Sequence, residues 1–194
     1  MAEFCDRVAS GLARLKYDNI GTVEFLRSPE GAFTFLEMNT RLQVEHGVTE
    51  EVTGIDLVVA QIRTAAGEAV HHVIPGEVRS TGHAIQARVC AEDPVRFLPS
   101  PGPLTVFRLP QGRGVRVETG YAEGGKVSPF YDSLVAKIIV HRPTREAAVD
   151  ALIESLQQTR IEGIKTNIPA LINILRSPAF RDGRVHTGLA MAAI

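Results

Sequence analysis

The chain has 194 residues, 44% of them hydrophobic and 22% charged, which is typical of a globular protein with one large or two small domains. Its formal net charge of −1 excludes a basic field that would attract nucleic acid or an anionic membrane. Two cysteines are too few for a disulfide framework, and no apolar run approaches the roughly 20 residues that span a bilayer, so we expect a cytoplasmic protein with reduced thiols.

The first part of the chain predicts a helix and a β-hairpin. Residues 3–17 place apolar side chains near one helical stripe. Residues 22–27 and 32–38 are strand-like, and the turn sequence Ser-Pro-Glu-Gly at 28–31 lies between them. We therefore expect two antiparallel strands joined by a four-residue loop.

The hairpin brings two carboxylates together. With a four-residue loop, Glu24 pairs with Phe35, and Glu37 becomes its diagonal neighbour on the same face, roughly 7–8 Å away. Two such carboxylates repel unless a cation lies between them, and Mg²⁺ sites often combine one or two carboxylates with phosphate oxygens. Asn39 can add a neutral oxygen. The predicted metal ligands are Glu24, Glu37 and Asn39; a pair of glutamates on a solvated strand is the alternative.

Polar residues occupy every second position from Glu37 to Glu45. In an extended strand, Glu37, Asn39, Arg41, Gln43 and Glu45 would all project from one face. That face would offer metal ligands, a guanidinium fork for an anion and a carboxylate base. From the pattern alone, a solvent-facing strand is an equal alternative.

The rest of the sequence predicts a second, β-rich segment. Asp56 can cap a helix that stops at Gly67. Residues 68–81 are polar and broken by Pro75 and Gly76, so we place a domain boundary between 78 and 79. Strands are expected near 82–91, 103–108, 114–119 and 133–141, and helices over 143–158 and 169–175. The predicted fold class is α+β.

Several motifs, in a fixed order, resemble one known family. Glu24, Glu37 and Asn39 resemble the metal pattern of the ATP-grasp superfamily, and Arg-Leu-Gln-Val-Glu-His at 41–46 resembles biotin carboxylase more specifically. The stretches GHAIQAR at 82–88, AEDP at 91–94, FLPSPG at 97–102 and YDS at 131–133 also resemble that family. Gly47 departs from it, because the family more often has proline there.

The resemblance covers essentially the whole chain and implies its organisation. Residues 1–78 would be the C-terminal part of an ATP-grasp domain that carries the metal and bicarbonate site. Residues 79–194 would be the β-rich biotin carboxylase C-terminal domain with flanking helices. The family's glycine-rich lid and phosphate-binding lysines lie upstream of this region, so our hypothesis is that the polypeptide alone is inactive.

The resemblance also implies a reaction and its cofactors. ATP phosphorylates bicarbonate to carboxyphosphate, and biotin on its carrier protein is then carboxylated. Two Mg²⁺ or Mn²⁺ ions would be held by Glu24, Glu37 and Asn39, and the nucleotide would contact Leu26 and Glu37. The implied partners are a biotin carboxyl carrier protein or domain and a carboxyltransferase component, with a homodimer formed through the C-terminal domain.

Substrate-binding roles follow from the same resemblance. Glu45 would be the base that takes the bicarbonate proton, and Arg41 would bind bicarbonate or orient the intermediate. Gln43 and the backbone of Val44 would contribute further hydrogen bonds. Arg88, on the strand face opposite Ala87 and Val89, would bind bicarbonate and stabilise the charge on the biotin ring. A guanidinium suits this role because it stays protonated and presents a planar fork.

Two other functions stay open from the sequence. The chain could belong to another ATP-grasp ligase, or it could be a non-enzymatic module for dimerisation or carrier-protein binding. The final carboxyl acceptor is also open among acetyl-CoA, propionyl-CoA, another acyl-CoA, pyruvate and urea. The phosphate-loop-like spacing at 120–126 predicts a glycine-rich turn instead, because Val127 replaces the required Ser or Thr.

Overall fold

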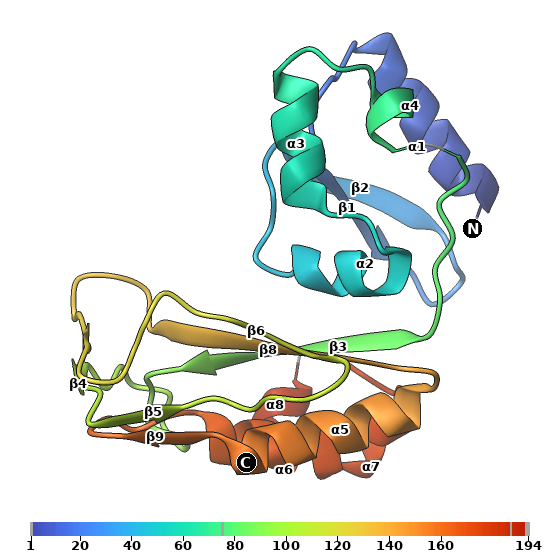
Figure 1. The fold of residues 1–194 in the computed structure, drawn as a ribbon. Coiled ribbons are helices and arrows are strands. Elements are labelled where there is room, and N and C mark those ends of the chain that lie inside the picture. Colours follow the sequence, from blue (N-terminus) through green and yellow to red (C-terminus); the bar gives the residue numbers. More distant parts are fainter. Residues whose placement is uncertain (1, 75, 187, 193–194) are drawn as a thin grey trace. The chain divides into compact units, whose positions relative to one another are not determined.

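The computed structural model describes residues 2–74, 76–186 and 188–192. It divides the chain into two compact units, shown as a ribbon in Figure 1. The first unit contains the residues up to His46 and Thr53–Arg79, and the second contains Gly47–Val52 and the residues from Ser80 onward. Helices are combined with antiparallel strand pairs, so the predicted α+β class is confirmed.

The first unit is built around the β-hairpin. Its elements are α1 (Ala2–Arg14), β1 (Thr22–Arg27), β2 (Phe33–Asn39), α3 (Leu57–Ala65) and α4 (Val70–Val73). Phe4 of α1 packs on the hairpin, with ring centroids 4.8 Å from Phe25 and 4.3 Å from Phe33. This aromatic contact explains why the amphipathic α1 lies against the strands.

The ends of two helices in this unit can be compared with the sequence. The α1 helix ends at Arg14, three residues earlier than predicted, and Leu15 beyond it is 78% exposed. The start of α3 follows the prediction, because the Val59 N–H donates to Asp56 Oδ1 at 2.8 Å. Gly67 follows the end of α3 with a φ of +94°, a conformation that favours glycine as the stop.

The second unit contains a three-stranded antiparallel sheet in the order β3-β8-β6. The bounds are β3 (His83–Cys90), β6 (Val115–Glu118) and β8 (Leu134–Arg142). Two short pairs accompany it: β4 (Gly102–Pro103) with β7 (Lys126–Val127), and β5 (Val106–Arg108) with β9 (Arg160–Glu162). Its helices are α5 (Arg145–Gln158), α6 (Ile168–Arg176), α7 (Pro178–Arg181) and α8 (Leu189–Ala192), and α2 (His46–Thr53) contributes its central residues.

Helix α5 covers one face of this sheet (Figure 1). The core between them includes Val89 of β3, Ile138 and Val140 of β8, and Leu152 and Leu156 of α5, all almost completely buried. Thr144 caps α5 by accepting the Ala147 N–H at 3.2 Å. The sheet therefore rests on a helix whose start is fixed by its own sequence.

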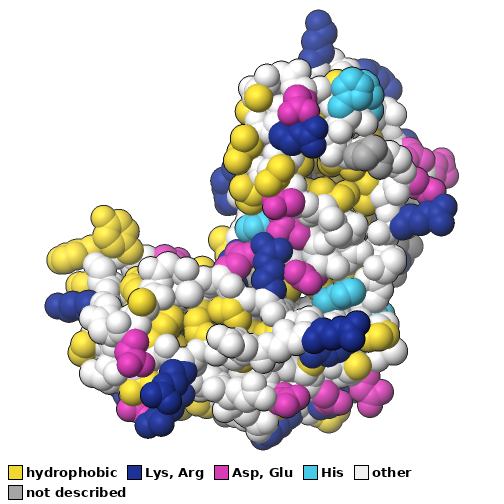
Figure 2. All heavy atoms as spheres, in the orientation of Figure 1, with side chains coloured by type: hydrophobic (Ala, Val, Ile, Leu, Met, Phe, Trp, Pro, Cys, Tyr) yellow, Lys and Arg dark blue, Asp and Glu magenta, His cyan; other side chains and the backbone are white. Residues whose placement is uncertain are grey.

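Surface character agrees with the near-neutral composition. On the face drawn in Figure 2, acidic and basic side chains are interspersed, and no continuous basic field is visible. None of the helices formed by the described residues has the length and apolar content required to cross a membrane.

Candidate functional site

The two carboxylates of the hairpin face each other directly. Glu24 of β1 is the register partner of Glu37 of β2. The predicted register, with Glu24 opposite Phe35, is wrong, because the loop contains five residues and a β-bulge at Leu36 shifts the pairing between Glu24 and Phe25. The bulge therefore places Glu24 and Glu37 on the same face of the hairpin, as predicted, although as direct and not diagonal neighbours.

Two side-chain amides donate hydrogen bonds to this carboxylate pair. Asn39 Nδ2 donates to Glu24 Oε1 at 2.9 Å and to Glu37 Oε1 at 3.3 Å. Gln43 Nε2 also donates to Glu24 Oε1, at 3.2 Å. Neutral donors partly offset the repulsion between the two carboxylates. The structure thus brings together both predicted acidic ligands, Asn39 and one predicted substrate-binding residue.

The donor set suits a hard divalent cation. Mg²⁺ prefers oxygen ligands and often takes one or two carboxylates. Glu24 and Glu37 supply these, and a half-turn of the Asn39 amide would present Oδ1 in place of Nδ2. Leu26 projects from the same side of β1 as Glu24 by strand alternation and is 59% exposed, so an apolar surface adjoins the polar one.

The polar run does not continue as a strand beyond Asn39. Strand β2 ends there, and residues 40–45 form an irregular loop before α2. The expectation of one extended face from Glu37 to Glu45 is therefore wrong. Asn39 pairs with Thr22, the first residue of β1, so β1 supplies no partner for a longer β2.

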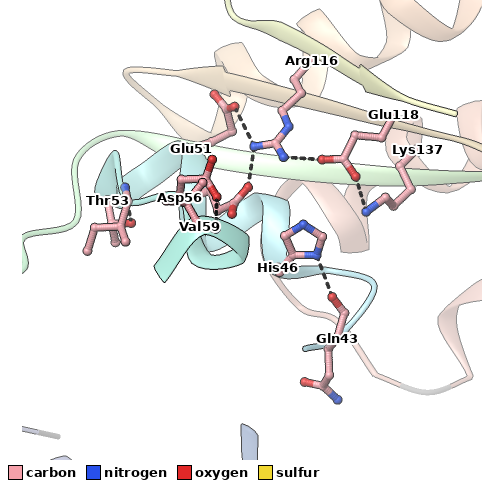
Figure 3. Close-up of polar contacts among 11 residues, drawn as sticks. Gln43, His46, Glu51, Thr53, Asp56, Val59, Arg116, Glu118 and Lys137 are labelled. Carbon is pink, nitrogen blue, oxygen red and sulfur yellow. Dashed lines mark hydrogen bonds and ion pairs between the residues drawn. The ribbon is translucent and has the colours of Figure 1, made fainter. Parts of the chain in front are cut away.

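The end of this loop is shaped by the start of α2. The Gln43 carbonyl accepts the His46 backbone N–H at 3.2 Å and lies 2.8 Å from His46 Nδ1 (Figure 3). Because a carbonyl oxygen can only accept, His46 Nδ1 is the donor in this contact, which ties the ring to the loop before α2. Arg41 Nη1 donates to the Leu42 carbonyl at 3.2 Å, within the loop. The predicted base, Glu45, is exposed, as are Arg41 and Val44.

Arg88 belongs to the second unit. It is exposed on β3, between the buried Ala87 and Val89, as strand alternation requires. Its register partner on β8 is Lys137, whose own partner on β6 is Glu118. One face of the sheet is therefore packed on the core, and the opposite face carries charged side chains.

Helix α2 contributes an ion-pair network to this charged face, shown in Figure 3. Arg116 Nη1 lies 2.6 Å from Glu50 Oε2 and 3.6 Å from Glu51 Oε1, and Arg116 also pairs with Glu118. Lys137 pairs with the second oxygen of Glu118. Glu50 is only 6% exposed, so helix α2 is joined to β6 through a buried carboxylate. We had not singled out this network from the sequence.

The network determines how Glu118 ionises. Burial by itself raises the pKa of Glu118, but the hydrogen bond and charge of Lys137 and the charge of Arg116 outweigh it, so the pKa lies below its ordinary value. Gly47 adds a steric contact on the same face, because a Cβ atom there would overlap Ile139 Cδ1. This close approach explains why a residue without a side chain fits at Gly47.

Other sequence features have structural explanations. The glycine-rich stretch at 120–126 leads through a turn into β7 rather than a helix, as predicted. The short α4, which contains His71 and His72, lies within residues 68–81, where the sequence predicted no helix. Cys5 and Cys90 are both free thiols, as expected.

The charged sheet and the hairpin lie in stretches of the chain that match two different family models. The family described as biotin carboxylase C-terminal domain matches residues 86–191, more than half of the chain. The chain belongs to the biotin carboxylase family. A second family, the ATP-binding domain of the carbamoyl-phosphate synthase L chain, matches residues 4–73. The C-terminal part of an ATP-grasp domain thus precedes the biotin carboxylase C-terminal domain, as predicted.

Individual relatives agree with this assignment. A biotin carboxylase of Halalkalibacterium halodurans is 53% identical over 173 residues, which cover 89% of this chain and 38% of the relative. The 2-oxoglutarate carboxylase small subunit of Hydrogenobacter thermophilus is 44% identical over 181 residues, covering 93% of this chain and 38% of the relative. The chain therefore spans less than half the length of the relatives that it matches.

Solved structures give the same result. The biotin carboxylase domain of a thermophilic 2-oxoglutarate carboxylase, bound to bicarbonate, superposes with a TM-score of 0.90 at 42% identity, covering 95% of this chain and 42% of that one. The biotin carboxylase domain dimer from Hydrogenobacter thermophilus, in complex with MgADP, ADP and bicarbonate, gives a TM-score of 0.83 at 44% identity, covering 89% and 38%. Another kind of ATP-grasp ligase is therefore not favoured.

Proposed function

We propose that this chain supplies the metal- and bicarbonate-binding groups of a biotin carboxylase, which uses ATP to carboxylate biotin on a carrier protein. The observation that carries this proposal is the Glu24–Glu37 pair, which the strand register places face to face and the Asn39 amide bridges. Membership of the biotin carboxylase family supports it further. We also propose the domain division at 78/79, a cytoplasmic location, and a homodimer through the C-terminal domain.

The carboxylate pair suits the phosphoryl-transfer step. In-line transfer of a phosphoryl group depends mainly on positioning and on neutralising negative charge. Two Mg²⁺ or Mn²⁺ ions bound by Glu24, Glu37 and Asn39 would supply that neutralisation for ATP. A half-turn of the Asn39 amide would present Oδ1 to the cation, and the Gln43 amide, which now donates to Glu24, would turn away from it. The exposed Leu26 would contact the nucleotide base.

Two further groups act on bicarbonate and biotin in this proposal. Glu45 takes the bicarbonate proton, and Arg41 binds the resulting anion together with Gln43 and the Val44 backbone. Arg88 stabilises the charge that develops on the biotin ring. A carrier protein presents biotin, and a separate carboxyltransferase component passes the carboxyl group to the final acceptor.

The decisive experiment measures phosphate release from ATP with Mg²⁺, bicarbonate and free biotin. It compares this chain with a protein in which the upstream half of the Halalkalibacterium halodurans relative precedes it. We expect activity only in the restored protein, because positioning of the nucleotide supplies much of the rate. Activity in the short chain would contradict the hypothesis that it is inactive alone. An absence of phosphate release in both proteins would favour the non-enzymatic module.

Variants of the restored protein separate the proposed roles. Glu45→Gln should abolish carboxylation, and unchanged turnover would remove Glu45 as the base. In the restored protein, Glu37→Gln should also weaken Mn²⁺ binding, measured directly by titration, because one of two carboxylate ligands is lost. Asp182→Asn is the matched control for charge, since Asp182 pairs with Arg184 in the other unit. Equal Mn²⁺ affinity in all three proteins would refute the metal site.

A further inference from the structure

Asn167 is one of three buried polar or charged residues among those that the structure describes. Its side chain contacts β3 instead of capping the helix that follows it. It stands at the N-cap of α6, where an asparagine oxygen ordinarily accepts a helix N–H, but its side chain makes no capping hydrogen bond. Instead Nδ2 donates to the Arg88 carbonyl at 3.0 Å, and Oδ1 accepts the Cys90 N–H at 2.9 Å. The Asn167 N–H also donates to the Cys90 carbonyl, at 3.1 Å.

These three hydrogen bonds contact β3 where its pairing within the sheet is incomplete. Strand β3 lies at the edge of the sheet, so one side of its backbone has no strand partner. Its pairing with β8 is also interrupted by a bulge between Val89 and Cys90, one residue beyond Arg88. Asn167 therefore supplies hydrogen bonds on the free side of the strand, where pairing on the other side becomes irregular.

The segment that carries Asn167 is itself anchored. The Lys165 N–H donates to Ser100 Oγ at 3.0 Å, and Lys165 Nζ lies 2.8 Å from Asp93 Oδ2. Gly163 has a φ of +95° and approaches the Pro103 carbonyl so closely that a Cβ atom would overlap it. Because this loop is anchored at Gly163 and at Lys165, the position of Asn167 relative to β3 is well defined.

We propose that Asn167 is the positioning residue for Arg88. By bridging the Arg88 carbonyl and the Cys90 N–H, it fixes the backbone from which the Arg88 guanidinium projects on the charged face of the sheet. This inference rests on the role of Arg88 proposed above. A displacement of about 1 Å in a substrate-contacting group can reduce turnover by as much as 10²-fold, so a fixed backbone at this position affects the biotin step.

The first test needs no activity and uses this chain alone. Amide hydrogen exchange of Cys90 should be about threefold to tenfold faster in Asn167→Ala, as expected for the loss of one buried hydrogen bond. The Arg88 side-chain Nε–H resonance should shift as well. Thr144→Ala is the matched control, because it removes one helix-capping hydrogen bond in the same unit and should leave both signals unchanged. Unchanged Cys90 exchange in Asn167→Ala would overturn the proposal.

Asn167→Asp separates the two side-chain contacts. It keeps an acceptor for the Cys90 N–H but places an oxygen against the Arg88 carbonyl in place of the donor. Cys90 exchange should therefore stay slow, while the Arg88 Nε–H resonance shifts as it does in Asn167→Ala. An unshifted resonance would refute the view that the bond to the Arg88 carbonyl orients the side chain.

The second test uses the restored enzyme and a double-mutant cycle. Asn167→Ala should lower the biotin-dependent kcat roughly tenfold. In an Arg88→Ala background the same change should have almost no further effect. An equal loss in both backgrounds would identify Asn167 as merely structural. If the restored parent itself were inactive, the proposed function would be contradicted. The exchange measurements would still decide whether Asn167 fixes the backbone at Arg88 and Cys90.

Discussion

Arg116 holds its guanidinium against the buried carboxylate of Glu50, so removing the charge of Arg116 should destabilise the second unit. We consider Arg116→Met, which keeps most of the side-chain volume and removes the charge. Breaking a fully buried pair from one side destabilises a protein by about 3–5 kcal/mol, because the other charge stays buried. Glu50 is 6% exposed, but Arg116 is 34% exposed, so water already reaches the guanidinium. We therefore expect a loss of about 2–3 kcal/mol.

Neutralising the other partner of the ion pair, Glu50, should reduce the free energy of unfolding by a smaller amount. Glu50→Gln places a neutral amide in the buried position and leaves Arg116 with Glu118 and Glu51. The expected loss is about 1 kcal/mol, close to the value of one ordinary hydrogen bond. The prediction is therefore an asymmetry: removing the cation is worse than neutralising the anion.

Urea denaturation, followed by circular dichroism and by amide exchange of β8, measures both losses. With a slope of about 2 kcal/mol per M, Arg116→Met should lower the midpoint by about 1 M. Arg184→Met is the control, because its ion pair with Asp182 is exposed and contributes at most about 1 kcal/mol. If Arg116→Met lost no more stability than Arg184→Met, or less than Glu50→Gln, the reasoning from burial would be refuted.

Two further predictions concern the same charged face. Gly47→Ala should destabilise the second unit by about 1–3 kcal/mol in the same urea assay, because the added Cβ overlaps Ile139 Cδ1; an unchanged midpoint would show that Ile139 moves aside freely. The pKa of Glu118 is lowered in the folded state, so its ionisation stabilises the fold above the ordinary value of 4.5 and this stabilisation is lost as the pH falls through the lowered value. The urea midpoint should therefore drop less steeply below pH 4.5 in Glu118→Gln than in the parent, and identical slopes would contradict the role of this carboxylate.

Local signals predicted most secondary-structure elements. The cap at Asp56 and the stop at Gly67 fixed α3, and alternation around Arg88 identified β3 and its exposed face. These signals act over a few residues, so they can be read without knowledge of the tertiary structure. The elements missed, including α2, α4 and β9, are short or depend on partners distant in sequence.

Contacts between distant residues account for the errors. The five-residue loop and the bulge at Leu36 each shift the hairpin register by one residue, so Glu24 pairs with Glu37 instead of Phe35. The sequence of an isolated hairpin carries no clear signal for the bulge. The polar alternation from Glu37 to Glu45 resembled a strand, but β1 begins at Thr22 and leaves residues beyond Asn39 without a strand to pair with. Alternation therefore predicted the direction of the Glu37 and Asn39 side chains, whereas Gln43 reaches Glu24 from an irregular loop.

The two groups of predicted site residues are held in different ways, and the difference matches their proposed roles. The Glu24 and Glu37 carboxylates are bridged by the Asn39 side-chain amide, and Gln43 donates to Glu24; both amides can rotate when a cation binds. Arg88 projects from a backbone fixed by β8 on one side and by Asn167 on the other. A metal site that exchanges nucleotide in each cycle benefits from adaptable ligands, whereas a guanidinium that stabilises a developing charge acts best when it is positioned in advance. Coupling between Asn167 and Arg88 therefore tests this distinction most directly, because an adaptable Arg88 would not respond to a change in its backbone.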